Sequence, residues 1–190
     1  MLDNFIIALD AADGNILWEY DCKNYQGKNT DVNPNTPVYS DGCIYVTSGY
    51  GKGGAKIKLS DDAAKVETQQ WVNTVLDCHH GGVVIVDGYI YGTNHKGNWI
   101  CVDFKDGSVK YDTKGIGKGS VTYGDGRLYC YDEKNATVAL VEPTPEDFKV
   151  ISSFKAPLGD GECWPHPVIC DGRLYIRRGN ALMVYDIKAD

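Results

Sequence analysis

The sequence predicts an all-β fold: a β-propeller with about four blades in this chain, each blade a four-stranded antiparallel sheet. The main observation is a phrase of Asp-Gly-X-X-Tyr that occurs four times, with its turns 46, 38 and 46 residues apart. An Asp-Gly pair between apolar runs indicates a β-hairpin, and a period of this length indicates repeated supersecondary units. The 22 Gly and 13 Tyr residues also favour strands joined by tight turns. The four turns are Asp41-Gly42, Asp87-Gly88, Asp125-Gly126 and Asp171-Gly172.

Each blade is expected to contribute four strands in the same order. An apolar first strand precedes each Asp-Gly turn, a second strand carries the Tyr of the phrase, and third and fourth strands follow. The third strands are expected to end near Leu9, Leu59, Val102, Leu140 and Val184. The sequence therefore predicts one partial propeller domain over 1–190, with blade repeats at about 1–35, 36–79, 80–117, 118–160 and 161–190.

The order of the expected strands does not close a ring. The chain starts with a third and a fourth strand and finishes with a first, a second and a third, so a four-blade ring would leave one strand surplus. We expect the chain to be the C-terminal portion of a longer propeller. Unpaired strand edges favour association, so a homodimer is expected to close the open fan; a stable monomer in sedimentation would contradict this.

The turn after the first strand of the chain carries a recognisable spacing, Ala8-X-Asp10-X-X-X-Gly14-X-X-X-Trp18. It resembles the tryptophan-docking repeat of the quinoprotein alcohol dehydrogenase-like β-propellers, the PQQ-like repeat, which occurs in bacterial proteins. The resemblance implies that the aromatic residue packs between neighbouring blades and that the repeat is structural. In this chain the residues that match the docking repeat are Ala8, Asp10, Gly14 and Trp18, and in a second copy Asp103, Gly107 and Tyr111.

The resemblance also implies what a catalytic member would need. Quinoprotein dehydrogenases hold pyrroloquinoline quinone (PQQ) near adjacent cysteines and bind calcium through Glu, Asn and Asp oxygens. None of the seven cysteines here is adjacent to another, and no spacing identifies a calcium loop. No cofactor is therefore predicted, and PQQ with calcium is the alternative. Four cysteines within strand patterns are expected to be buried apolar fillers: Cys43, Cys101, Cys130 and Cys170.

Charge and hydrophobicity exclude several classes of partner. With 26 acidic against 19 basic residues the net charge is −7, so no nucleic-acid partner is expected. The apolar run from Phe5 to Leu9 is too short to span a bilayer. The first residues do not read as a secretory signal. We expect the full-length protein to be periplasmic or extracellular, with its signal outside this chain; a cytoplasmic location is the alternative.

Candidate ligand-binding residues precede the innermost strands. Aligned on the Asp of each turn, the residue seven positions before is Pro34, His80, Lys118 or Trp164, and the residue five before is Thr36, Gly82, Ser120 or His166. These positions are expected to meet at one mouth of the central channel. The predicted site comprises His79, His80, Asn94, His95, Lys118, Trp164 and His166. The alternative is that these side chains only cap loops and fill gaps between blades.

A metal at this site is not predicted. His79 and His80 are adjacent, and in an extended chain their side chains would point in opposite directions. The sequence thus favours a non-catalytic binding or scaffold module, for a protein or a saccharide, with no catalytic residue. The alternative is a fragment of a quinone-dependent alcohol or sugar dehydrogenase.

Overall fold

The computed structural model describes residues 1–2, 4–27 and 32–188 of the chain. The described part is almost entirely β-structure, with one short helix, α1 (Lys23–Gln26). Its first sheet has two strands and its last sheet has three, on either side of three four-stranded sheets. The first sheet pairs β1 (Phe5–Leu9) with β2 (Ile16–Asp21).

The other strands follow in chain order and pair antiparallel with their neighbours in sequence. The first complete sheet comprises β3 (Val38–Ser40), β4 (Cys43–Ser48), β5 (Gly53–Leu59) and β6 (Val66–Asn73). The second comprises β7 (Val83–Val86), β8 (Tyr89–Thr93), β9 (Asn98–Asp103) and β10 (Val109–Lys114). The third comprises β11 (Gly119–Gly124), β12 (Arg127–Asp132), β13 (Thr137–Glu142) and β14 (Lys149–Lys155). The last comprises β15 (Val168–Cys170), β16 (Arg173–Arg178) and β17 (Ala181–Asp186).

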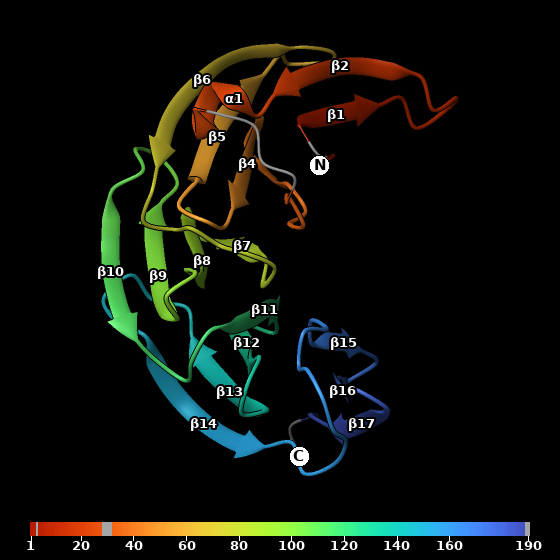
Figure 1. The fold of residues 1–190 in the computed structure, drawn as a ribbon, viewed down its shortest axis with the longest axis vertical. Helices are drawn as coiled ribbons and strands as arrows, with labels where there is room; N and C mark the ends of the chain where they lie inside the picture. Colours follow the sequence, from red (N-terminus) through yellow and green to blue (C-terminus); the bar gives the residue numbers. More distant parts are fainter. Residues whose placement is uncertain (3, 28–31, 189–190) are drawn as a thin grey trace.

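Together the sheets form an open arc (Figure 1). The first strands β7, β11 and β15 lie toward the inside of the arc, and the fourth strands β6, β10 and β14 form its outer rim. The sheets at the two ends of the arc do not meet. The partial β-propeller predicted from the sequence is confirmed.

The four Asp-Gly turns have the backbone conformation that a tight hairpin between twisted strands requires. The Asp residues have φ of 49 to 51° and the following Gly residues have φ of 69 to 81°. Positive φ at both central positions is the type I′ arrangement, which Asp and Gly tolerate best. The repeated dipeptide therefore sets the register between the first and second strand of each sheet.

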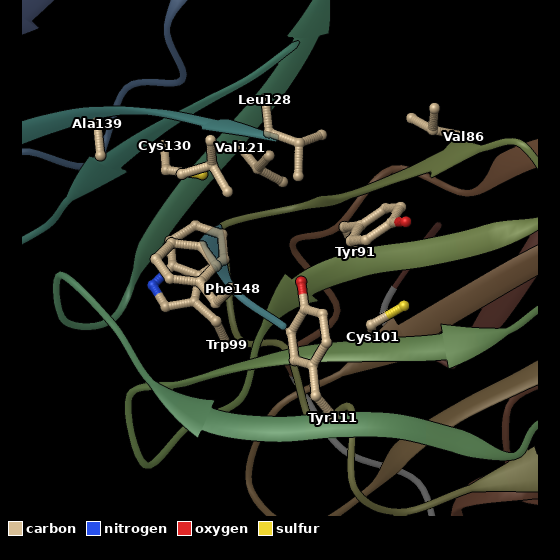
Figure 2. Packing of buried hydrophobic residues seen from close by; sticks show 11 residues of the cluster. Val86, Tyr91, Trp99, Cys101, Tyr111, Val121, Leu128, Cys130, Ala139 and Phe148 are labelled. Atoms are coloured by element: carbon tan, nitrogen blue, oxygen red, sulfur yellow. The ribbon is translucent and has the colours of Figure 1, made fainter. Parts of the chain in front are cut away.

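The core lies between neighbouring sheets, since each sheet covers a face of the next. Between the second and third complete sheets, the ring of Trp99 stacks on that of Phe148 at 4.7 Å with an interplanar angle of 20° (Figure 2). Trp99 is 1% exposed, and its indole nitrogen donates to the carbonyl of Gly117 at 3.0 Å. The apolar cluster around this pair includes Tyr91, Tyr111 and Leu128. One tightly packed interface of this kind joins each pair of sheets.

The residues of the docking repeat also lie at these interfaces. Trp18, opposite Ala8 in the pairing of β1 with β2, donates its indole N–H to the carbonyl of Ala63 in the next sheet at 2.9 Å. Tyr111, opposite Cys101, occupies the same register and is buried in the cluster with Phe148. A register shift precedes the aromatic residue in both hairpins.

The turns of the docking repeat have matching hydrogen bonds. The amide of Gly14 donates to the carbonyl of Asp10 at 2.8 Å, and that of Gly107 donates to the carbonyl of Asp103 at 2.9 Å. The two Gly residues have φ of 77 and 78°. The carboxylate of each Asp accepts a further amide two residues along. The two copies are therefore the same turn.

The first complete sheet (β3 to β6) docks through a residue that sequence analysis missed. Thr68 stands in the register of Trp18, and Trp71 further along β6 takes over the contact. A Cβ at Gly107 would lie 2.9 Å from the Trp71 ring, and the side-chain Nδ2 of Asn73 donates to the carbonyl of Gly107 at 2.9 Å. Trp71 thus makes the same kind of contact between sheets as Trp18, but from a different position along its strand.

Three of the four cysteines that were expected to be buried within strands are buried. All seven are free, and Cys43, Cys101 and Cys130 are buried. Burial raises the pKa of the Cys101 thiol to about 12. The expectation was wrong for Cys170, which is exposed. Ile169 points toward the preceding sheet, so Cys170 faces the open end of the arc, where no further described sheet packs.

Within the described residues, no helix has the length and apolar character needed to cross a lipid bilayer.

The stacked pair between sheets gives a test of the packing. Replacing Trp99 with Ala should destabilise the fold by about 3 to 5 kcal/mol, the usual cost of deleting a large buried aromatic side chain. The matched control is Trp164→Ala, because Trp164 is 56% exposed and its loss should change stability far less. Urea unfolding followed by circular dichroism measures both. Equal effects of the two substitutions would contradict the described packing.

Candidate functional site

The strand order brings the connections to two opposite faces. Because neighbouring strands are antiparallel, the links between sheets (74–82, 115–118 and 156–167) share one face with the turns between second and third strands (49–52, 94–97 and 133–136). We call this the loop face. The Asp-Gly turns and the turns between third and fourth strands lie on the other, the Asp-Gly face. All seven predicted site residues lie on the loop face.

Five of the rings on the loop face form a connected cluster, which we call the aromatic platform: Tyr50, His79, His80, His95 and Trp164. The Tyr50 ring lies 4.8 Å from that of His79 and 4.9 Å from that of His95, between ring centroids. The His79 ring lies 5.3 Å from His95 and 5.0 Å from His80, and the His80 ring lies 5.7 Å from Trp164. Residues from four different connections therefore converge on the loop face.

Tyr50 belongs to this cluster although the sequence did not identify it. Its phenol shares a hydrogen bond of 3.0 Å with Nε2 of His79. Its φ of 63° is unusual for a bulky residue, and such strain persists only where neighbouring contacts impose it. One such contact is at Gly49, where a Cβ would lie 2.9 Å from the Cα of His79. Tyr50 is 53% exposed, so the strained turn presents its ring to solvent.

The side chain of Asp77 also holds the turn that carries Tyr50. Its carboxylate accepts amide N–H groups from Gly51, Lys52 and Gly53 at 2.9 to 3.1 Å. Three such bonds satisfy an anion without a cation. The turn that carries Tyr50 is therefore tied to the link that carries the histidines.

On the other side of the platform, a buried carboxylate holds two of the predicted residues. Glu133, 8% exposed, accepts hydrogen bonds from Nε2 of His80 at 2.8 Å and from Nζ of Lys118 at 3.1 Å, both at Oε2. Sequence analysis missed Glu133, because nothing in its local pattern distinguishes it from a turn residue. This pairing holds the His80 ring next to the ring of Trp164.

The link before β7 is held by Asn35, a second residue that the sequence did not identify. Its side-chain amide donates to the carbonyls of Cys78 at 2.7 Å and His79 at 3.0 Å, and its oxygen accepts from the amide of Gly82 at 3.1 Å. His166 joins from the last sheet, where its Nε2 donates to the carbonyl of His80 at 3.0 Å. The chain bends at His79 and His80, and this bend brings their rings together.

That bend corrects one expectation. Adjacent side chains alternate only in an extended strand, and here the two imidazoles are in edge contact because the backbone at His79 and His80 is not extended. Asn94 differs from the other predicted residues. It is buried, and its side-chain oxygen accepts the amides of Lys96 and Asn98 at 3.0 Å, so it closes its own turn.

The imidazoles have unused hydrogen-bonding capacity. The Nδ1 atoms of His79 and His80 are buried and have no hydrogen-bond partner among the described residues. Burial lowers the pKa of His79, and the nearby charge of Lys118 adds to the effect. The neutral imidazole is thus the favoured form of His79 near neutral pH.

The platform does not provide a metal site. Across the described ranges, no group of three or more His, Cys, Asp or Glu side chains is arranged to hold a metal ion. The Asp77 carboxylate, the acidic group nearest to the Tyr50 turn, already accepts three amides. The donor set present therefore does not fit the calcium that a PQQ site requires.

Next to the platform, a central hollow of about 550 Å³ lies along the inner strands β3, β7 and β11. His80 and His166 line its end at the loop face, and Tyr39 and Tyr123 line it toward the Asp-Gly face. A second hollow, of about 460 Å³, lies on the loop face itself between His95 and Glu133.

Comparison with known proteins agrees with the fold and with the repeat. A family model described as outer membrane protein assembly factor BamB matches residues 3–113. The crystal structure of BamB from Moraxella catarrhalis superimposes with a TM-score of 0.69 and 16% sequence identity over 96% of this chain and 51% of that one. A putative 6-phosphogluconolactonase from Bacteroides fragilis gives a TM-score of 0.63 and 10% identity over 98% of this chain and 60% of that one. The chain thus spans between half and two thirds of these structures. A search of curated proteins gives no significant match.

The lowered pKa of His79 predicts a pH-dependent stability. The unfolded chain takes up a proton at the ordinary histidine pKa, near 6.5, whereas the folded protein takes it up at a lower pH. Stability should therefore fall as the pH drops from about 6.5 toward the lowered value, and His79→Gln should reduce this slope. Urea unfolding at pH 7.5 and 5.5 measures the slope, with His79→Phe as a second variant without a titratable ring. An unchanged slope in both variants would contradict the burial of His79.

Proposed function

Because the chain belongs to the PQQ-repeat β-propeller family of the outer membrane protein assembly factor BamB, we propose that it is part of a non-catalytic scaffold that binds a protein partner through its loop face. The observation that carries this proposal is the aromatic platform. Loops from separate sheets bring five rings together, and a buried ion-pair network and side-chain amide bonds hold them.

The exposed members of the platform have the chemistry of a protein-binding surface. Trp164 is 56% exposed and Tyr50 is 53% exposed, and both ring positions are fixed by contacts with histidines. Tyr and Trp dominate the binding energy of protein interfaces because they bury a large area at a low entropy cost. Charged residues at the edge, such as Lys96 and Lys134, provide a polar rim.

The family suggests the setting of this interaction. BamB is named as an outer membrane protein assembly factor. By analogy we propose a periplasmic role in the assembly of outer membrane proteins, with a component of that process as the partner. This part of the proposal rests on the family alone, and a shared fold does not by itself establish a shared partner.

The rival function is that of a quinone-dependent dehydrogenase, and the side chains do not favour it. A PQQ enzyme needs oxygen ligands for calcium near the quinone, and no such set is formed by the described residues. Within the ranges that the structure describes, no acidic side chain lines the central hollow. We therefore assign no catalytic residue.

Photo-crosslinking in cells that produce the protein tests the loop face. A benzoylphenylalanine at position 50, 95 or 164 should capture one partner protein, because these side chains lie on the proposed interface. Matched controls at the exposed residues Asp61 and Lys105 on the Asp-Gly face should not capture it. With the captured protein purified, the double substitution of Tyr50 and Trp164 by Ala should weaken its binding by about tenfold or more. Equal capture on both faces, or unchanged affinity, would overturn the proposal.

Addition of PQQ and calcium separates the scaffold from the dehydrogenase. A ligand that binds only the folded state raises the melting temperature as its concentration rises. For the scaffold, PQQ with calcium and an electron acceptor should leave both the melting temperature and the absorption of the quinone unchanged. A large concentration-dependent rise in the melting temperature would favour the dehydrogenase instead.

A further inference from the structure

The central hollow differs in chemistry from the rest of the molecule. Charged residues make up 24% of the chain, yet among the described residues no Asp, Glu, Lys or Arg side chain lines this hollow. The hollow on the loop face, by contrast, is lined by Lys96, Lys114, Lys118, Asp132, Glu133 and Lys134. Apart from the imidazoles of His80 and His166, the described lining offers no side chain that could pair with a phosphate, a carboxylate or an ammonium group. A neutral ligand is therefore favoured.

The walls of the hollow combine exposed aromatic rings with an aliphatic strip. Tyr39, Ile85 and Tyr123 each stand two residues before the Asp of their turn, so they occupy the same height on three inner strands. β7 lies between β3 and β11, which places Ile85 between the two Tyr positions. Tyr39 is 66% exposed and Tyr123 is 43% exposed. The hydroxyl of Tyr39 accepts the amide of Gly42 at 3.3 Å, which anchors the ring at its tip.

Polar groups without partners face the same space. The hydroxyls of Thr36 and Tyr123 form no hydrogen bond within the described part of the chain, whereas that of Thr122 donates to the carbonyl of Pro167 at 2.7 Å; all three residues line the hollow. Nε2 of His166 is used by the carbonyl of His80, whereas its Nδ1 has no partner among those residues. The hollow therefore offers hydroxyl and imidazole hydrogen bonds next to flat apolar surfaces.

We propose that the central hollow is a carbohydrate-binding site that takes a short neutral oligosaccharide along the inner strands β3, β7 and β11. Pyranose rings present an apolar C–H face and a rim of hydroxyls, which match the Tyr rings and the free polar groups. A volume of about 550 Å³ is within the usual range for small-molecule sites. The site is separate from the proposed protein interface, although both include His80.

Isothermal titration with maltotriose, cellotriose and tri-N-acetylchitotriose, each neutral, tests the site, with trigalacturonic acid as the charged comparison. At least one neutral trisaccharide should bind, and trigalacturonic acid should bind at least about tenfold more weakly. Tyr39→Ala and Tyr123→Ala should each weaken binding by about tenfold, because each removes an exposed ring from the wall. Tyr39→Phe retains the ring and should retain most of the affinity.

The matched control is Tyr50→Ala, which removes an exposed Tyr of the aromatic platform and leaves the hollow intact. It should not change oligosaccharide binding, although it should weaken the binding of the protein partner. Absence of binding by all three neutral sugars would overturn the site and leave the scaffold proposal standing. The site would also be overturned if Tyr50→Ala weakened oligosaccharide binding while Tyr39→Ala and Tyr123→Ala did not. Equal affinity for trigalacturonic acid and the neutral sugars would overturn it too.

Discussion

The structure depends on one constraint: a four-stranded sheet has two faces, and each sheet here can bury both only by packing between two neighbours. Aromatic residues on the outer half of one sheet make this contact with the next. Trp18 reaches the carbonyl of Ala63, Trp71 covers Gly107, and the ring of Trp99 stacks on Phe148. Because the same contact recurs, the angle between successive sheets recurs too, and the sheets follow an arc (Figure 1).

The arc determines what can meet on the loop face. Each link enters an inner strand at the same height, so residues about 40 positions apart in sequence approach a common axis. Close backbone packing reinforces this at the inner strands. A Cβ at Gly81 would lie 2.0 Å from the carbonyl oxygen of Gly119, so the two links are in direct contact. The amide of Val121 also donates to the carbonyl of Gly81 at 3.1 Å. The histidine-bearing link is therefore held by its neighbour in the next sheet.

Most of the fold could be predicted because its information is local and repeated. The Asp-Gly turns, the alternation around them and the docking turn at Asp10 each specify a hairpin on their own. The incomplete sheets at the two ends of the arc follow from counting strands. Errors arose where tertiary context decided the outcome. Trp71 carries the docking contact at a shifted register, and Cys170 is exposed because the arc ends at its sheet.

The site was predicted less completely than the fold, for a related reason. His80, Lys118 and Trp164 could be expected at one mouth of the channel because the repeats align their positions. The groups that hold them could not: Glu133 lies 53 residues from His80, and Asn35 lies 44 residues from His79. Tyr50 takes a conformation that only its contact with His79 explains. Hydrogen-bond partners at such separations have no periodic signature in one sequence, whereas the positions of the loops do.

The two proposed sites follow from the same geometry but differ in solvation. Loop-face residues stand at the ends of strands, where charged side chains reach water, and His80 is hydrogen-bonded to Glu133, which also pairs with Lys118. Inner-strand residues instead line the central hollow side by side on β3, β7 and β11. Their Tyr, Thr and Ile side chains leave a surface that is polar without being charged. A convergent arc of sheets thus produces a charged, ring-bearing rim suited to a protein and a neutral interior suited to a small hydroxylated ligand.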